Sequence, residues 1–369
     1  MKALLLSLTL ASVSILPAAN AADLSSMSWE QVVSQAKSEG KVVWYNWFLQ
    51  NDFRQQVKSF EDTYGIEVVI PEGSHDANLQ KFLANSNRKN GDIDVLSLGG
   101  GDITKINAKK TLIGPLPSLL PNGNKLKYKI EGADSKGYGV AYWGNQTGIA
   151  YNPAFISKEQ LPQSIADFDA YLAKNPEMLG FNTVNGGSGP ALIESITKNI
   201  ATDIHYQTDK PTKTTMAKLQ PAWNWFNNNK GKYIITASNS DSITRLNSGE
   251  FAMVATWEDF LAGLQNKGEV SKNIKFYIPK LGMPGGGNIV VIPKNTQHPA
   301  ASLLFVSWLT SAATQTAFNQ RFGSAPQNPD ADDSNALISI EERKNSTDWA
   351  NQPLKESITN TFIKEVTLH

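Results

Sequence analysis

The feature that most constrains the fold is the alternation of short apolar runs with amphipathic helical patterns along the first third of the chain. Apolar residues almost fill three runs that are typical of buried strands, at residues 42–47, 66–70 and 95–98. Apolar residues spaced three or four positions apart predict helices between and before these runs, at residues 28–40, 52–64 and 77–88. This order predicts an α/β fold in which a mainly parallel sheet is flanked by helices.

The middle of the chain indicates a passage from one domain to a second. Two extended runs, at residues 138–143 and 148–151, are separated by a short segment that contains Gly144, Asn145 and Gln146. Helical and strand patterns alternate again from about residue 164 onwards. A chain of 369 residues is long enough to bury two cores, so we expect two lobes, each a mainly parallel sheet flanked by helices.

Composition and the N-terminal segment exclude several classes of protein. The chain has no cysteine, which excludes disulfides, zinc–thiolate sites and thiol catalysis. Residues 1–21 are typical of a cleavable export signal, because Lys2 precedes an apolar run that ends near Ala19 and Ala21. This run is shorter than the roughly 18 residues that cross a bilayer, so we expect a periplasmic protein without a membrane anchor. Loss of Lys2 reduces the 34 basic residues to 33, against 34 acidic residues, which gives no reason to expect nucleic acid as a partner.

Loops at the carboxyl ends of the first strands are the natural place for a ligand, because such loops converge at one edge of a parallel sheet. They lie at residues 46–52, 72–76 and 99–104. Ser74, Gly100 and Asp102 are candidate ligand contacts in these loops, and Gly100 permits a close backbone approach. Ser74 and Asp102 could equally cap the helices that follow them. The neighbouring His75 is more typical of a structural residue.

Aromatic residues gather near carboxylates at the predicted strand ends. The aromatic residues are Trp47, Phe48, Tyr142, Trp143 and Trp257, and the carboxylates are Asp102, Glu258 and Asp259. All of the aromatic residues except Tyr142, together with Asp102 and Glu258, are the candidate ligand contacts of this group. Aromatic faces beside carboxylates bind organic cations, although each of these rings could instead pack in a core. Asn145, in the segment between the two domains, completes this group of candidates.

A glycine- and serine-rich loop at residues 185–189 precedes a predicted helix that begins near Pro190. Backbone N–H groups near Gly187 and the Ser188 hydroxyl could hold an anionic group, and a flexible connection is the alternative. Ser240 lies in a second polar cluster, residues 237–241, which could contact a ligand or cap a short helix.

Known catalytic motifs are absent from the sequence. It contains neither a G-x-S-x-G elbow nor an H-E-x-x-H pattern, and its four histidines are scattered. We therefore expect no catalytic residues, no metal site and no cofactor. A secreted hydrolase or lyase on the same scaffold is the alternative, because a fold does not determine function.

Segments along the whole mature chain, taken in order, resemble one known family. They are GKVVWY at residues 40–45, YGIEV at 64–68, GDIDV at 91–95, GYGVAYWGNQTGIAYN at 137–152, LNSGEFA at 246–252, VIPK at 291–294 and HPAA at 298–301. Behind an export signal, this combination resembles the type II periplasmic solute-binding proteins of ABC importers. The pattern is similar to the branch that handles thiamine, polyamines, iron and phosphonates.

The resemblance implies two lobes around a cleft that closes over its ligand by a hinge motion. It places the crossings between lobes near residues 144–148 and 275–278. Lobe 1 would comprise residues 22–146 and 277–320, and lobe 2 residues 147–276 and 321–369. It also implies a monomer that delivers a small-molecule solute to an ABC permease and its ATPase in the inner membrane. A chemoreceptor ectodomain is an alternative docking partner.

The nature of the solute follows less directly. Ferric-binding members of the family carry adjacent tyrosines as ligands, and this sequence has no Tyr-Tyr pair, which disfavours iron. The aromatic and acidic candidates favour a thiamine-like or other organic cation. The glycine- and serine-rich loop indicates an anionic group instead, so a phosphorylated small molecule is a further hypothesis.

Overall fold

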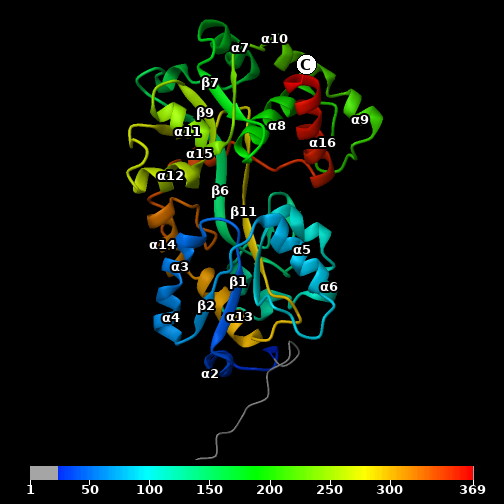
Figure 1. Cartoon of the computed structure of the whole chain (residues 1–369), viewed down its shortest axis with the longest axis vertical. Coiled ribbons are helices and arrows are strands. Elements are labelled where there is room, and N and C mark those ends of the chain that lie inside the picture. The colour runs from blue at the N-terminus through cyan, green and yellow to red at the C-terminus, as the bar shows by residue number, and fades with distance from the viewer. Residues whose placement is uncertain (1–23, 369) are drawn as a thin grey trace, which may run out of the picture.

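The computed structural model describes residues 24–368 and shows two lobes stacked along the long axis of the molecule (Figure 1). The predicted export signal lies outside the described residues. Two long strands, β6 (Val140–Tyr151) and β11 (Met283–Val291), run from one lobe into the other. The α/β class predicted from the alternation of strands and helices is confirmed. No helix within residues 24–368 is long and apolar enough to span a membrane.

The lower lobe holds the N-terminal elements and two later helices. Its strands are β1 (Lys41–Tyr45), β2 (Glu67–Val69), β3 (Val95–Gly99), β4 (Lys129–Ile130) and β5 (Ala133–Asp134). Its helices are α2 (Trp29–Glu39), α3 (Gln50–Gln56), α4 (Lys58–Tyr64), α5 (His75–Asn85), α6 (Ala108–Thr111), α13 (Pro299–Leu309) and α14 (Ala312–Phe322). Short 3₁₀ helices, η1 (Gly100–Lys105), η2 (Leu116–Ser118) and η3 (Gly123–Lys125), complete it.

The upper lobe holds the middle of the chain and its C-terminal helix. Its strands are β7 (Leu179–Asn182), β8 (Ile234–Thr236), β9 (Met253–Trp257) and β10 (Lys275–Tyr277). Its helices are η4 (Lys158–Gln160), α7 (Ile165–Lys174), α8 (Ser188–Ile200), α9 (Lys213–Ala217), α10 (Gln220–Asn228), α11 (Asn239–Asn247), α12 (Glu258–Asn266), α16 (Gln352–Phe362) and the π-helical turn η5 (Ile363–Thr367). The remaining elements, α15 (Ile340–Arg343) and β12 (Ser346–Thr347), lie on the segment that leads to α16.

The strands form one curled sheet in the order β2-β1-β3-β11-β6-β9-β7-β8. The strands at each end of this order run parallel, while β11 and β6 are antiparallel in the centre. β6 pairs with β11 as far as Gln146 and with β9 from Thr147 onwards. One strand therefore contributes to both lobes, because its two halves have different partners.

The second crossing lies later in the chain than the sequence indicates. β10, which begins at Lys275, pairs with the upper half of β6 and stays in the upper lobe. The passage is made by β11, where Gly285, Gly286 and Gly287 pair with residues of β6. Three consecutive glycines give β11 no apolar pattern at this point, whereas β10 contains aromatic residues that are typical of a strand. This is why the sequence places the second crossing too early in the chain.

Local sequence signals account for the helix ends of the lower lobe. Ser28 and Gln31 form the expected capping box at the start of α2, and Gly40 ends this helix in the left-handed conformation. The helix expected at residues 52–64 is divided at Val57 into α3 and α4, and Gly65 ends the second of them. These caps direct β1 and β2 into the sheet, so that the loops after them reach the edge that faces the upper lobe.

Candidate functional site

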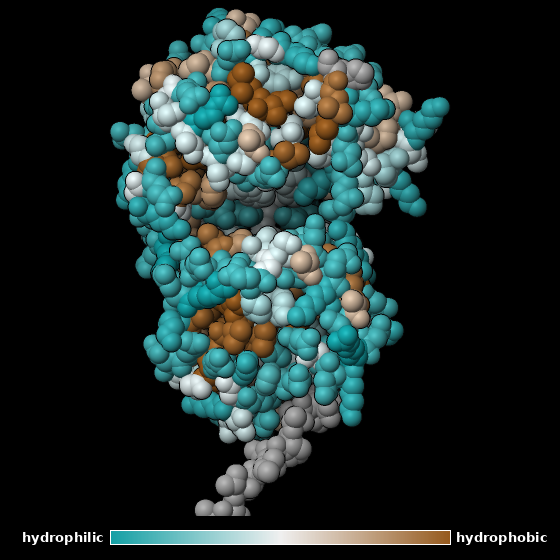
Figure 2. Space-filling view, viewed as in Figure 1, coloured by the Kyte–Doolittle hydropathy of each residue, from teal (hydrophilic) through white to brown (hydrophobic). Residues whose placement is uncertain are grey.

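A cavity of about 790 Å³ lies between the two lobes, where Figure 2 shows the surface hollowed. Loops after β1 and β3 line it from the lower lobe, and α12 lines it from the upper lobe. Asn145 on β6 and Asn288 on β11 form its back. Binding sites for small molecules commonly occupy about 300–1,000 Å³. The position at the carboxyl ends of parallel strands is the one expected from the strand order.

Aromatic rings from both lobes face the cavity. Trp47 and Phe48 follow β1 and pack edge to face, with their ring centroids 5.2 Å apart. Phe48 rests on Trp143, which is fully buried beneath it at a centroid distance of 5.4 Å. Trp257 ends β9 on the opposite lobe and is only partly buried. The cavity therefore offers indole faces from two sides, and the lower one stands on a rigid aromatic base.

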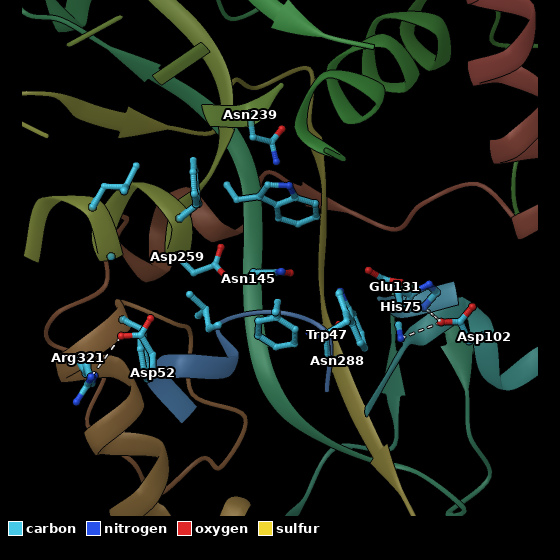
Figure 3. Close-up of a pocket in the computed structure, with 18 of the residues that line it drawn as sticks. Trp47, Asp52, His75, Asp102, Glu131, Asn145, Asn239, Asp259, Asn288 and Arg321 are labelled. Carbon is cyan, nitrogen blue, oxygen red and sulfur yellow. Dashed lines mark hydrogen bonds and ion pairs between the residues drawn. The ribbon is translucent and has the colours of Figure 1, made fainter. Parts of the chain in front are cut away.

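His75 is held between two carboxylates at the lower wall (Figure 3). Its Nε2 lies 2.6 Å from Asp102 Oδ2 and its Nδ1 lies 3.0 Å from Asp76 Oδ1. The hydrogen bond with Asp102 raises the pKa of His75 despite its partial burial. Burial works against ionisation of Asp102, but the bond to His75 lowers the pKa of this carboxyl overall. A catalytic triad needs one ring nitrogen of the histidine to face a nucleophile, and here both face carboxylates, so the hydrolase alternative gains no support.

An ion-pair cluster joins the two lobes at another edge of the cavity. Asp52 on α3 lies 3.2 Å from Lys267 Nζ, just after α12, and 3.3 Å from an Arg321 guanidinium nitrogen on α14. Figure 3 shows Asp52 and Arg321 together beside the cavity. The Lys267 contact spans the gap between the lobes, so its geometry depends on how far the cleft is closed.

Two oxygen atoms beside the cavity have no hydrogen-bond partner among the described residues. They are Asp259 Oδ1 on α12 and Asn145 Oδ1 on β6, and both atoms are shielded from solvent. The other Asp259 oxygen accepts a hydrogen bond of 2.9 Å from Trp143 Nε1. Burial raises the pKa of Asp259 to about 6. Buried acceptors nearly always have a donor, so this pair indicates the place where a ligand supplies N–H or O–H groups.

Glu131 lies on the other side of the cavity from Asp259 (Figure 3). It follows β4 in the left-handed conformation, with φ of 53°, and its carboxyl group accepts backbone hydrogen bonds from Gly100 and Gly101. Burial raises the pKa of Glu131, and the charge of Lys355 on α16 works in the opposite direction. The Lys355 Nζ lies 3.5 Å from the centre of the Trp349 ring.

The structure brings five of the twelve sequence candidates together around the cavity. They are Trp47, Phe48, Asp102, Asn145 and Trp257. Gly187 lies next to them, against the Trp257 ring, and lines a smaller hollow with it. These residues come from segments far apart in the chain, which meet because the strands that carry them end at the same edge.

The other six candidates have different places. Ser74 caps α5 by accepting a hydrogen bond from the Ala77 N–H, and Ser240 is exposed on α11. Gly100 packs tightly against Ile130. Trp143 belongs to the core of the lower lobe. Ser188 and Glu258 are fully buried.

Internal bonds occupy the two buried polar candidates. The Ser188 hydroxyl lies 2.6 Å from Asn239 Oδ1 and also bonds Asn182, so it is committed to fixing its loop. Glu258 pairs through Oε1 with Arg343 at 2.9 Å, and burial raises the pKa of Glu258 to about 7. Successive helix positions point about 100° apart, and it is therefore the next residue, Asp259, that faces the cavity.

Sequence reasoning missed several residues that line the cavity. They are Asp52, Glu131, Asn239, Lys267, Asn288, Arg321 and Lys355. Most are single polar residues on helices or in loops without a motif. A signal exists for Asn288, which follows the three glycines of β11, because consecutive glycines in a strand often mark a close approach.

Comparisons with known proteins agree with this geometry. The family described as "Bacterial extracellular solute-binding protein" matches residues 55–345. The chain belongs to this family. A relative in this comparison, the Fe(3+)-binding periplasmic protein of Serratia marcescens, is 25% identical over 79% of this chain and 80% of its own length. The putrescine-binding periplasmic protein SpuD of Pseudomonas aeruginosa is 24% identical over 83% of this chain and 78% of its own length.

A solved structure shows the same fold as this member of the solute-binding family. It is the spermidine/putrescine ABC transporter substrate-binding protein PotD of Streptococcus pneumoniae, with a TM-score of 0.67 and 13% identity. The match covers 89% of this chain and 98% of that one. The resemblance to substrate-binding proteins of ABC importers, and the two-lobed fold that it implies, are therefore confirmed.

Proposed function

We propose that this protein captures a small organic cation with a primary or secondary ammonium group in the cleft between its lobes. The observation that carries this proposal is the pair of unpartnered acceptors, Asp259 Oδ1 and Asn145 Oδ1, beside the cavity. An ammonium group with N–H bonds satisfies both acceptors, and its charge matches the Asp259 carboxylate. A quaternary ammonium has no N–H to donate and leaves both oxygens without a partner.

The aromatic lining supports the same class of solute. Trp47, Phe48, Trp257 and Phe260 present ring faces or edges to the cavity. Such rings attract a cation electrostatically, with about 0.5–2 kcal/mol for a well-placed contact, and they exclude water from the carbon chain of the solute. A thiamine-like compound lies outside this class, because its positive charge is on a thiazolium nitrogen that carries no N–H bond.

The names of the two relatives suggest two different cargoes, and the cavity favours one of them. Putrescine is an amine, whereas ferric ion needs several anionic ligands. Among the described residues that line the cavity there is no tyrosine, and residues 24–368 contain no cluster of three or more His, Cys, Asp or Glu side chains placed to hold a metal. These two points support an amine over iron.

The architecture supports delivery of the cargo to a membrane transporter. The two crossing strands carry Gly144 and three consecutive glycines, Gly285–287, where the lobes meet. Backbone without side chains at this position allows the hinge motion through which such proteins close. We propose that the exported protein works in the periplasm and presents the closed, loaded form to an ABC permease and its ATPase in the inner membrane.

The test is a thermal-shift and calorimetric screen of residues 22–369. The panel contains primary amines, the N,N,N-trimethyl analogue of each amine, thiamine, choline phosphate and ferric citrate. A ligand at one hundred times its dissociation constant stabilises the folded state by about 2.7 kcal/mol, so the expected result is a clear shift with the primary amines alone. Equal binding of the trimethyl analogues, or a shift with ferric citrate only, contradicts the proposal.

A further inference from the structure

The charged side chains that line the cleft balance one another. The carboxylates are Asp52, Asp102, Glu131 and Asp259, and the permanent cations are Lys267, Arg321 and Lys355. His75 is the fourth positive group, because carboxylates on both of its ring nitrogens favour the imidazolium form. The four carboxyl groups thus face three permanent cations and His75, so opposite charges largely offset one another and the cavity has no large negative charge with which to attract a multiply charged cation.

Most of these charged groups already have partners within the protein. Asp52 is paired with Lys267 and Arg321, and Asp102 is paired with His75. Glu131 receives two backbone N–H groups. Two groups differ from the rest. Asp259 receives the Trp143 indole N–H and local backbone N–H groups but has no cationic partner, and Lys355 Nζ has no carboxylate within ion-pair distance, among residues 24–368.

Both groups line the cavity, and Lys355 lies on the side of Glu131. Lys355 is near enough to Glu131 for its charge to favour the ionised form of that carboxyl group. Figure 3 shows Glu131 across the cavity from Asp259 and Asn145. A ligand that spans the cavity therefore meets an unpartnered anion at one end and an unpaired cation at the other.

We infer that the cargo is a zwitterion, with its ammonium group at Asp259 and Asn145 and a carboxylate end directed toward Lys355. This inference rests on the proposed function and narrows it. A diamine of the same length would bring its second ammonium group toward Lys355 and the His75 imidazolium, which repel it. The carboxylates at this end, Asp102 and Glu131, are already engaged by His75 and by backbone N–H groups. A monoamine would leave Lys355 without an anion, so it would forgo one charge-assisted contact.

Three matched series of ligands test the inference in the full mature protein. They are straight-chain monoamines, α,ω-diamines and ω-amino acids with four, five and six carbons, and ω-aminoalkyl phosphonates form a fourth arm for a doubly charged end. The expected result by titration calorimetry is that the best ω-amino acid binds at least tenfold more tightly than the monoamine and the diamine of its own length. The phosphonate is expected to bind less tightly than the carboxylate, because a single lysine meets it.

Lys355→Met removes the charge and keeps an unbranched side chain against Trp349. We expect it to weaken ω-amino acid binding at least tenfold and to leave monoamine binding within twofold. Lys364→Met is the matched control, because Lys364 follows α16 in η5, is largely exposed, pairs with Glu365 and does not line the cavity. A diamine that equals or exceeds the amino acid, or an amino acid preference that survives Lys355→Met, overturns the zwitterion and leaves the ammonium site standing. If no member of any series binds, both the zwitterion inference and the proposed function are contradicted.

Discussion

The two walls of the cleft differ in whether their polar groups already have partners within the protein. On the lower wall, the charged groups that line the cavity are held by partners within the protein, as in the contacts of His75 with Asp76 and Asp102. On the upper wall, α12 presents Asp259 with one oxygen that has no hydrogen-bond partner among the described residues. The lower wall is complete without a ligand, whereas the upper wall has an acceptor that a ligand must satisfy.

This difference predicts that the lower wall determines the stability and shape of the cleft, and that the upper wall determines its affinity for the ligand. The lower wall stands on a packed aromatic base in which Trp143 contacts Phe48 and Phe53 at centroid distances of 5.4 Å. We expect changes there to alter folding stability. Changes at the upper wall should alter ligand binding, because the groups there are not needed to hold the lobe together. The following predictions test this division, from the largest expected effect to the smallest.

Trp143→Ala should lower the free energy of unfolding by about 3–5 kcal/mol, because it leaves a cavity in a fully packed core. Urea denaturation measures the loss. The matched variant is Trp257→Ala on the opposite wall, where the ring is partly exposed. This second variant should leave stability almost unchanged and weaken ligand binding by about 1–3 kcal/mol. Equal destabilisation by both variants contradicts the division between the walls.

Asp259→Asn should weaken binding of a primary ammonium ligand by about tenfold to one hundredfold, the value of a charge-assisted hydrogen bond of about 1.5–3 kcal/mol. Calorimetry with the best ω-amino acid or amine measures it. Stability should stay equal or rise, because the variant removes a carboxylate whose ionisation burial opposes. Asp102→Asn is the contrasting variant. It breaks the pair with His75 and should reduce stability more than affinity.

Affinity for the ammonium ligand should fall as the pH decreases through about 6, because burial raises the pKa of Asp259 to about 6 and only the ionised carboxylate attracts the cation. Below that pH each unit should weaken binding by up to tenfold. The folded-state pKa of Asp259 lies above its ordinary value, so ionisation of this group opposes folding, and this penalty disappears as the pH falls. Calorimetry between pH 5 and 8 gives the profile. A profile that stays equally steep in Asp259→Asn assigns the dependence to another group.

The sequence predicts the fold much better than the site. Alternating apolar and amphipathic patterns locate β1, β3, α2 and α5 to within a few residues. The reason is that burial patterns and helix caps depend on residues close together in the sequence. Asp102 and Trp257 reach the cavity as predicted from strand ends, since parallel strands carry their following loops to one edge. Patterns of this kind specify where a loop lies, and they are silent on which residue in it points inward.

The exchange of Glu258 for Asp259 illustrates what is missing. Both carboxylates follow Trp257, and only the direction in which α12 leaves the strand determines which one faces the ligand. Lys355 comes from the last helix, and its place at the cavity depends on the path of the chain behind the crossing strands. Ser188 looks like an anion contact in the sequence, but Asn239, about fifty positions later, takes its hydrogen bond. Long-range packing of this type leaves no local signal.

Lys267→Met should have the smallest effect, although its ion pair with Asp52 joins the two lobes. The Lys267 side chain is 48% exposed, and an ion pair of this kind contributes about 0–1 kcal/mol. Arg321 still neutralises Asp52 in the variant. We expect the dissociation constant to change less than threefold, with a weaker dependence on salt than in the unchanged protein. A much larger loss would mean that the matched charges of the lower wall also hold the cleft closed, and the division between shape and affinity would then fail at this edge of the cavity.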